Sequence, residues 1–342
     1  MEWINLMSDT VTKPTPAMLN AMFAAEVGDD VFGEDPSVNA LQDYAAQLFG
    51  KAAALFCPSG TMTNQIALKV HTQPLDEIIC DVNSHIYQYE VGGFAFHSQA
   101  SIQLLQGTNG KITAEQIAAA IKPDHDWLAQ SKLVVLENSC NKGGGSYYTL
   151  EEIDPITQLC RQRGLALHLD GARLFNVLAE TGESPEEVGH RFDSISVCLS
   201  KGLGAPVGSL LIGTQPFIKQ ARRVRKVMGG GMRQAGYLAA AGYYALKNHL
   251  HRLKEDHQHA RLLGETLAEL PWVEYVSPVR TNIVIFGVRT PWTAPACIEW
   301  LKNQGIKAVV MGPQLIRFVT HLDITPEMIQ HTLKILRKPI TP

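Results

Sequence analysis

Short apolar runs alternate with longer helical patterns through the first two thirds of the chain, and this alternation limits the fold more than any other feature. Each run has the length of a buried strand, and the stretches between the runs carry apolar residues at spacings of three and four. The pattern is typical of a mostly parallel sheet covered by helices, so we expect an α/β fold. The strands are predicted at Ala53–Cys57, Glu77–Asp81, Lys132–Glu137, Leu165–Leu169, Ser194–Leu199 and Ser209–Gly213.

Several helices are marked by their ends. Helical spacing runs through Pro36–Phe49, and Thr149 and Glu152 have the spacing of a capping box at the start of another helix. One long helical segment is predicted from Met232 to about Leu270.

Beyond this segment the order of elements changes to strand, helix, strand, helix. A chain of 342 residues also exceeds the size at which a single core usually stops growing. We therefore expect an N-terminal arm over residues 1–15, a large domain with the parallel sheet over 16–250 and a smaller α+β domain over 251–342. The elements predicted for the small domain are Asn282–Val288, Thr293–Gln304, Gln314–Thr320 and Thr325–Arg337.

Charge and composition exclude several classes of protein. The net charge is −3, with 30 Lys and Arg against 33 Asp and Glu, so no basic field is available for nucleic acid or anionic lipid. No apolar run approaches the roughly 18–20 residues of a membrane helix. The six cysteines form no C-x-x-C pair, and the first residues lack the pattern of a signal peptide, so a cytoplasmic protein is expected. No metal site is predicted.

The first candidate site is a strand that runs into Ser59, Gly60 and Thr61 at the start of a helix. Free backbone N–H groups, two hydroxyls and the positive end of the helix dipole suit a phosphate. A plain helix N-cap explains the same residues equally well.

Two further apolar strands end in charged residues. Asp170 follows Leu165–Leu169, at the sheet edge where parallel sheets place ligands, although it could simply cap the next helix. Lys201 follows Ser194–Leu199, where burial could keep its amine neutral and nucleophilic, although it could also point to water.

The order of these three signals along the chain favours pyridoxal phosphate. That cofactor needs an anchor for its phosphate, a carboxylate for its ring nitrogen and an amine for its aldehyde. A nucleotide-binding oxidoreductase using Gly202–Gly208 is a weaker alternative, because Pro206 stands where a helix should begin.

The same stretches resemble the low-specificity L-threonine aldolases, which are pyridoxal-phosphate enzymes of the aspartate-aminotransferase fold (fold type I). The matching segments are Leu6–Thr12, Val27–Asp35, Pro58–Met62, Ser84–Tyr87, His168–Phe175, Ser200–Pro206, Gly229–Ala235 and Arg317–His321. The resemblance implies a homo-oligomer, a dimer that builds the sites or a tetramer of such dimers.

The resemblance also implies roles around the cofactor. Lys201 would attach to its aldehyde, Asp170 would pair with the ring nitrogen, Ala172 would pack under the ring and His85 would stack over it. The other contacts are assigned to Ser59, Gly60, Thr61, Arg173 and Ser200 and, from a neighbouring subunit, Lys226 and Arg233.

For the substrate, the resemblance implies cleavage of L-threonine, L-allo-threonine and related β-hydroxy-α-amino acids to glycine and an aldehyde. Ser8, Arg173 and Arg317 would bind the carboxylate, and His85 would take the β-hydroxyl proton. Tyr87 would line the pocket.

One departure from the family bears on the choice of substrate. Cys140 stands where many relatives have a histidine that helps with the hydroxyl, and it is assigned to the substrate pocket. A β-eliminating lyase, or an aldolase that prefers aryl substrates of the phenylserine type, therefore stays open as an alternative.

Overall fold

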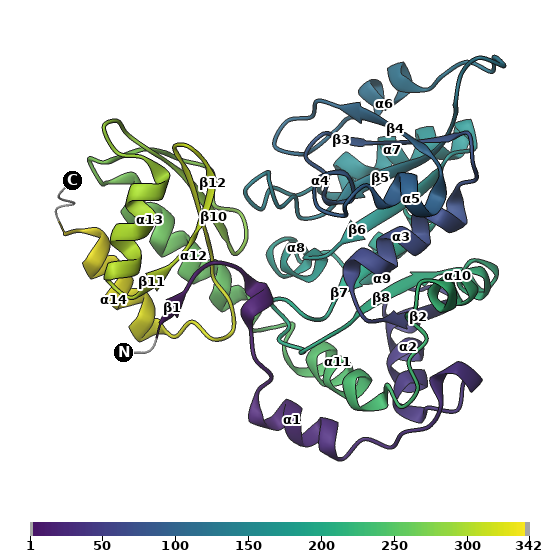
Figure 1. Ribbon diagram of the computed structural model, residues 1–342, viewed down its shortest axis with the longest axis horizontal. Helices are drawn as coiled ribbons and strands as arrows, with labels where there is room; N and C mark the ends of the chain where they lie inside the picture. Colours follow the sequence, from purple (N-terminus) through teal and green to yellow (C-terminus); the bar gives the residue numbers. More distant parts are fainter. Residues whose placement is uncertain (1–2, 339–342) are drawn as a thin grey trace.

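A seven-stranded sheet forms the centre of the larger part of the molecule (Figure 1). The computed structural model describes residues 3–338, and the outermost residues of the predicted arm and small domain lie outside that range. All neighbouring strands run parallel except at β8, which is antiparallel to both of its neighbours. The strand order is β2 (Ala53–Cys57), β8 (Ser209–Gly213), β7 (Ser194–Cys198), β6 (Ala166–Gly171), β5 (Gln130–Glu137), β3 (Asp76–Asp81) and β4 (Ser101–Leu105).

The prediction of a mostly parallel sheet is confirmed. Its inner strands are buried along almost their whole length, as expected of a sheet with both faces covered, and this explains their continuous apolar runs. The edge strand β4 was missed, because its alternation of polar and apolar residues is too short to stand out. Covering and connecting helices are α1 (Pro16–Phe23), α2 (Pro36–Leu48), α3 (Gly60–His71), α4 (His85–Gln88), α5 (Gly93–Ser98), α6 (Ala114–Ala120), α7 (Leu150–Arg163), α8 (Leu174–Thr181), α9 (Pro185–Gly189) and α10 (Gln215–Val227).

The capping signals acted as predicted. Thr149 and Glu152 form a capping box at the start of α7, and α7 ends at Gly164 in the left-handed conformation.

The single long helix predicted from Met232 to Leu270 is wrong. The chain forms α11 (Gly236–Asn248) and α12 (Leu253–Ala268), with a break between them. At the break, buried His249 contacts the carbonyl oxygen of Leu203 through Nδ1 at 2.7 Å. This tertiary contact stabilises the turn between the two helices. The helical spacing of apolar residues on either side of the turn does not reveal the break.

A second, antiparallel sheet has its own hydrophobic core (Figure 1). Its strand order is β12 (Val309–Gly312), β13 (Leu315–Val319), β10 (Ile283–Val288) and β9 (Val273–Val276), and it packs with α12, α13 (Ala294–Asn303) and α14 (Pro326–Leu336). The N-terminal segment joins this part, because β1 (Ile4–Asn5) pairs in parallel with β11 (Ile306–Lys307). The residues after β1 run between the two sheets, where Asp9 contacts Arg173 on one side and Asn282 on the other. The exact domain boundaries stay a prediction.

Candidate active site

The carboxyl ends of two adjacent central strands bring Asp170 and Lys201 together. Asp170 lies near the end of β6 and is buried, and Lys201 lies just beyond β7. The amide nitrogen of Asn64, from α3, donates to Asp170 Oδ2 at 2.9 Å, and the backbone N–H of Ala172 donates to Oδ1 at 3.2 Å. Asp170 is therefore an acceptor held in a fixed orientation by these two hydrogen bonds. It lies at the carboxyl end of its strand, where the sequence placed it.

The Lys201 amine lies 3.2 Å from the Cys198 sulfur. Burial lowers the pKa of Lys201, but the neighbouring Cys198 and nearby carboxylates raise it more, so the net pKa lies above its ordinary value. A neutral, nucleophilic amine at this strand end stays a prediction. The Lys201 amine lies at the end of this strand, next to the end of the strand that carries Asp170.

The predicted phosphate cradle lies at the start of α3. The Ser59 hydroxyl accepts the Met62 N–H at 3.2 Å, so the N-cap explanation of this residue is correct. A Cβ at Gly60 would lie 2.6 Å from Cys198 Sγ, so only glycine fits against the strand that leads to Lys201. The N–H groups of Gly60 and Thr61 belong to the first helical turn, where no intrahelical acceptor exists. Phosphate binding there stays a prediction.

His85, the first residue of α4, is held at three points. Its backbone N–H donates to Glu137 Oε2 at 2.8 Å, and its Nδ1 lies 2.9 Å from Glu90 Oε1. Its ring lies 5.4 Å from that of Tyr89, centroid to centroid. The side chain is 33% exposed, so the rest of the ring is free to meet a ligand.

Glu137 was missed by the sequence analysis. It ends β5 and pairs in register with Asp170 on β6, the same strand-end position that pointed to Asp170. Burial and the nearby Asp170 raise its pKa to about 7, although the N–H groups of Asn141 and His85 favour the charged form. We call Asp170, Lys201 and Glu137 the strand-end cluster.

The three residues predicted to bind a carboxylate, which we call the arginine clamp, do come together. Arg173 forms a bidentate pair with buried Asp9, through Nε at 2.7 Å and Nη2 at 2.6 Å. The adjacent Ser8 accepts the Thr10 N–H at 3.2 Å. Arg317, on β13, donates to the carbonyl oxygen of the neighbouring Met7 at 3.1 Å.

Asp9 is a second residue that the sequence analysis missed. Burial alone would raise the pKa of Asp9, but Arg173 outweighs it and the pKa falls from 3.8 to about 2. Burial and the positive charge of Arg173 lower the pKa of Arg317. Within residues 3–338, Arg317 Nε is buried and has no hydrogen-bond partner. The clamp therefore contains one donor that has no partner among the described residues.

Other predicted residues are placed differently. Cys140 is buried in the main core, and its thiol lies 3.1 Å from the Glu137 carbonyl and 3.4 Å from that of Gly110. Its predicted contact with substrate finds no support, because the thiol is already engaged with backbone oxygens. Tyr87 packs beside Phe94, with ring centroids 6.2 Å apart.

The residues predicted to act across a subunit boundary lie near the end of α10. Arg233 forms an exposed ion pair with Asp29 at 2.8 Å, and Lys226 is in the last turn of the helix. Ser200, at the end of the strand before Lys201, is half-buried. Their contacts to a cofactor stay predictions.

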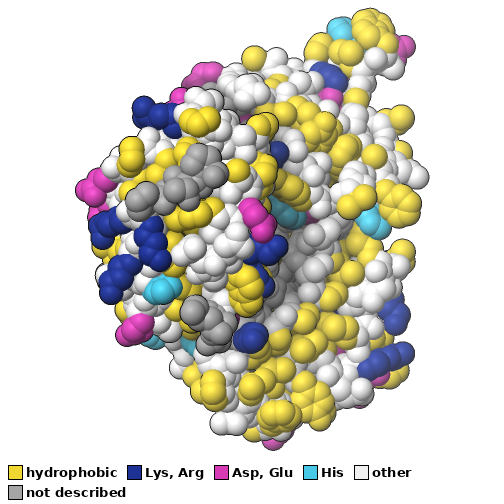
Figure 2. All heavy atoms as spheres, turned by 60° about the vertical axis from the view of Figure 1, so that its left-hand side comes forward, with side chains coloured by type: hydrophobic (Ala, Val, Ile, Leu, Met, Phe, Trp, Pro, Cys, Tyr) yellow, Lys and Arg dark blue, Asp and Glu magenta, His cyan; other side chains and the backbone are white. Residues whose placement is uncertain are grey.

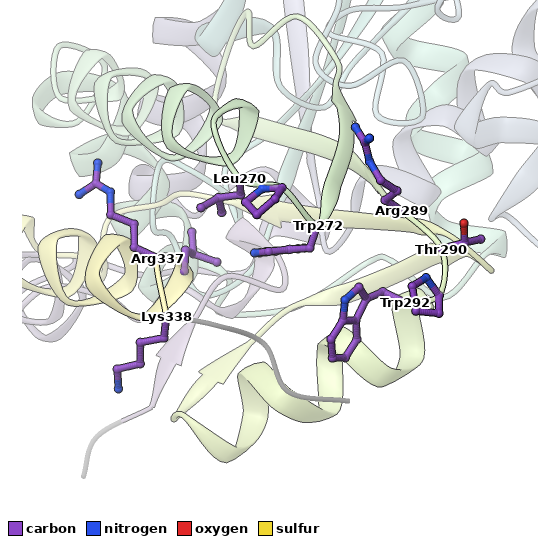
Figure 3. Close-up of a pocket in the computed structure, with 10 residues that line it drawn as sticks. Leu270, Trp272, Arg289, Thr290, Trp292, Arg337 and Lys338 are labelled. Atoms are coloured by element: carbon purple, nitrogen blue, oxygen red, sulfur yellow. The ribbon is translucent and has the colours of Figure 1, made fainter.

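The surface is hollowed between the two parts of the molecule, with histidine and basic side chains along the hollow (Figure 2). A separate cavity of about 510 Å³ lies in the small domain, lined by Trp272, Trp292, Arg289 and Arg337 among others (Figure 3). Among the described lining residues there is no histidine or carboxylate, so this cavity lacks the acid–base groups that the strand-end cluster offers.

The fold, with a mostly parallel sheet and a second antiparallel sheet, is that of a class of α/β enzymes. The chain matches the beta-eliminating lyase family over residues 5–291 and belongs to it. It is 45% identical to the low specificity L-threonine aldolase of Escherichia coli K12, over 95% of this chain and 96% of that one. It is 39% identical to low-specificity L-threonine aldolase 1 of Arabidopsis thaliana, over 97% and 95% of the two chains.

Solved structures agree on the fold. A threonine aldolase from Leishmania major superposes with a TM-score of 0.85 at 20% identity, covering 98% of each chain. A serine palmitoyltransferase from Sphingomonas wittichii gives 0.77 at 18% identity, covering 98% of this chain and 86% of that one. In residues 3–338, none of the helices has the length and apolar character needed to cross a membrane.

Proposed function

We propose that this protein is a pyridoxal-phosphate-dependent lyase that cleaves L-threonine, L-allo-threonine and related β-hydroxy-α-amino acids to glycine and an aldehyde. One observation carries the proposal: a buried carboxylate, Asp170, and an amine, Lys201, lie at the ends of adjacent strands. Relatives named as threonine aldolases, 45% identical over nearly the whole chain, support the choice of reaction.

The donor set fits pyridoxal phosphate. Asp170 would supply an oriented carboxylate for the ring nitrogen, and Lys201 would supply an amine for the aldehyde. The backbone N–H groups in the first turn of α3 would bind the phosphate. Glycine is required at position 60, because a Cβ there would lie 2.6 Å from Cys198 Sγ. When bound, the cofactor supplies an electron sink for the pair released from a bond at the substrate Cα.

The arginine clamp would bind the substrate carboxylate. Asp9 holds Arg173 in place, and the unpartnered Nε of Arg317 offers a donor beside it. A guanidinium pair suits a planar, bidentate anion. Fixing the carboxylate fixes rotation about the bond between nitrogen and Cα, and this rotation decides which bond at Cα breaks.

His85 would then accept the β-hydroxyl proton of the substrate. Loss of that proton allows the C–O bond to become a carbonyl as the Cα–Cβ bond breaks and the aldehyde leaves. A proton returned to Cα completes glycine. General base catalysis of this kind contributes on the order of a hundred- to ten-thousand-fold.

β-Elimination is the second candidate, because the matching family is described by that reaction. Product analysis separates the two. Glycine and acetaldehyde from L-threonine would support the aldolase, whereas pyruvate and ammonia from L-cysteine or L-tyrosine, with no glycine from threonine, would contradict it. Rates with L-allo-threonine and phenylserine would identify the preferred side chain.

A homo-oligomer is part of the proposal. Val227, at the end of α10, is 89% exposed and Phe32 is 73% exposed, while Val91 and Phe96 after His85 are 99% and 81% exposed. Such side chains mark an interaction surface where they form a contiguous patch, so we propose that these two regions lie at subunit contacts. Sedimentation analysis would distinguish a dimer from a tetramer. A cytoplasmic location is also proposed, because all six cysteines are buried free thiols.

A further inference from the structure

A buried chain of hydrogen bonds links Asp170 to the His85 ring, and Glu90 lies at its centre. Glu90 follows α4, and its side chain is fully buried. It accepts from Asn64 Nδ2 at 2.8 Å and from Gln65 Nε2 at 2.5 Å, both on α3. Its third partner is His85 Nδ1 at 2.9 Å. A buried carboxylate with this many fixed partners is expected to have a positional role.

The neighbours of Glu90 settle where the protons lie. Asn64 Oδ1 faces His168 Nε2 at 3.2 Å, so the amide nitrogen of Asn64 is turned toward the carboxylates and bridges Glu90 and Asp170. Glu90 thus meets amide donors on both oxygens and acts as an acceptor. The contact with His85 then requires the proton on Nδ1, which leaves Nε2 as the accepting nitrogen.

We propose that Glu90 is the positioning residue that fixes the His85 imidazole, keeping its proton on Nδ1 so that Nε2 receives the β-hydroxyl proton of the substrate. The inference rests on the proposed function only for the identity of that proton. The pairing of Glu90 with His85 Nδ1 does not depend on the proposed function. An acid paired with the far nitrogen of a histidine sets both its tautomer and its basicity.

The titratable groups that face His85 are Glu90, Asp170, Glu137 and Tyr89. Burial lowers the pKa of His85, but the hydrogen bond to Glu90 and the charges of Asp170 and Glu137 raise it above its ordinary value. Glu137 contacts only the backbone N–H of His85. Of these carboxylates, Glu90 is the one whose hydrogen bond reaches the ring within residues 3–338.

The test combines histidine ¹⁵N NMR with pH–rate profiles of the enzyme loaded with pyridoxal phosphate. Glu90→Gln keeps the size of the side chain but removes its charge. We expect the pKa of His85 to fall by about one unit, because a paired opposite charge is lost. The acid limb of kcat/KM for threonine should move to lower pH by the same amount, and the plateau should fall about tenfold. Glu90→Asp keeps the charge and should leave the limb in place.

The chain offers a matched control. Glu180 Oε2 lies 3.1 Å from His257 Nδ1, a similar acid–histidine pair on other elements. Glu180→Gln should leave the His85 titration and the rate profile unchanged.

Three results would overturn the inference. The first is a Glu90→Gln profile that matches the control, and the second is an equal shift in Glu90→Asp. The third needs no variant: a ¹⁵N signature placing the His85 proton on Nε2 in the wild-type protein, with or without cofactor. That signature stays readable if threonine is not cleaved, so failure of the proposed function and failure of this inference are distinguishable.

Discussion

The two sides of the candidate site are built in different ways. The strand-end cluster comes from neighbouring parallel strands, whose ends meet at one edge because the sheet repeats the same connection. The arginine clamp comes from three distant places: the N-terminal segment, the start of α8 and the middle of an antiparallel strand. The first arrangement follows from topology, whereas the second depends on contacts across almost the full length of the chain, such as Arg317 with Met7.

Asp9 joins the arginine clamp to the small antiparallel sheet. It pairs with Arg173 at the start of α8, and Asn282 Nδ2, next to β10 of the small sheet, lies 3.2 Å from its Oδ2. The clamp therefore has a structural role as well as a binding role, which the strand-end cluster does not share.

The largest effect is expected at the strand-end cluster. Lys201→Ala removes the amine at the end of this strand and should lower turnover on the order of a thousandfold or more. The absorbance of the bound cofactor near the visible range should also be lost or shifted, while the melting temperature stays close to that of the wild type. Full activity in this variant would contradict the assignment of the chemical step to the strand-end cluster.

Asp9→Asn should affect stability most. Leaving Arg173 buried without its partner costs about 3–5 kcal/mol, measurable by urea unfolding. Because the folded pKa of about 2 lies below the unfolded 3.8, the contribution of the wild-type carboxylate is present above about pH 4 and is lost as the pH falls toward 2. The difference in the free energy of unfolding between wild type and variant should therefore become smaller as the pH falls from about 4 toward 2. An equal stability at neutral pH would refute the linking role.

Arg317→Lys should weaken substrate binding and leave cofactor binding unchanged. Lysine keeps the charge but loses the fork of donors, so we expect KM for threonine to rise about ten- to a hundredfold. Cofactor affinity, measured by absorbance titration, should not change. A matching loss of cofactor affinity would show that the clamp and the strand-end cluster do not act separately.

Cys140→Ala should have the smallest effect. Its thiol contacts backbone oxygens in the core, so about 1 kcal/mol of stability is expected to be lost with KM within about twofold of the wild type. A tenfold change in KM for threonine, without a matching loss of stability, would restore the sequence-based assignment of Cys140 to the substrate pocket.

The same contrast explains what the sequence could predict. Asp170 and Lys201 could be predicted from the sequence because each follows an apolar run, and ligands bind at the ends of parallel strands. Glu137 has the same signal at the end of β5 and could have been found by it. The general α/β architecture followed from the same periodicity.

The remaining features depend on contacts that no local pattern carries. Asp9 sits beside the predicted Ser8, but its pairing with Arg173 needs the folded chain. Glu90 is a single acid in a loop, and its role appears only when α3 brings Asn64 and Gln65 against it. The break between α11 and α12 likewise depends on His249 meeting a distant carbonyl.

The most direct test is to supply pyridoxal phosphate, reduce the complex with borohydride and locate the modified residue by peptide mass spectrometry. The account predicts one stable adduct, on the Nζ of Lys201. Failure of the protein to take up the cofactor, or an adduct on a different lysine, would contradict it.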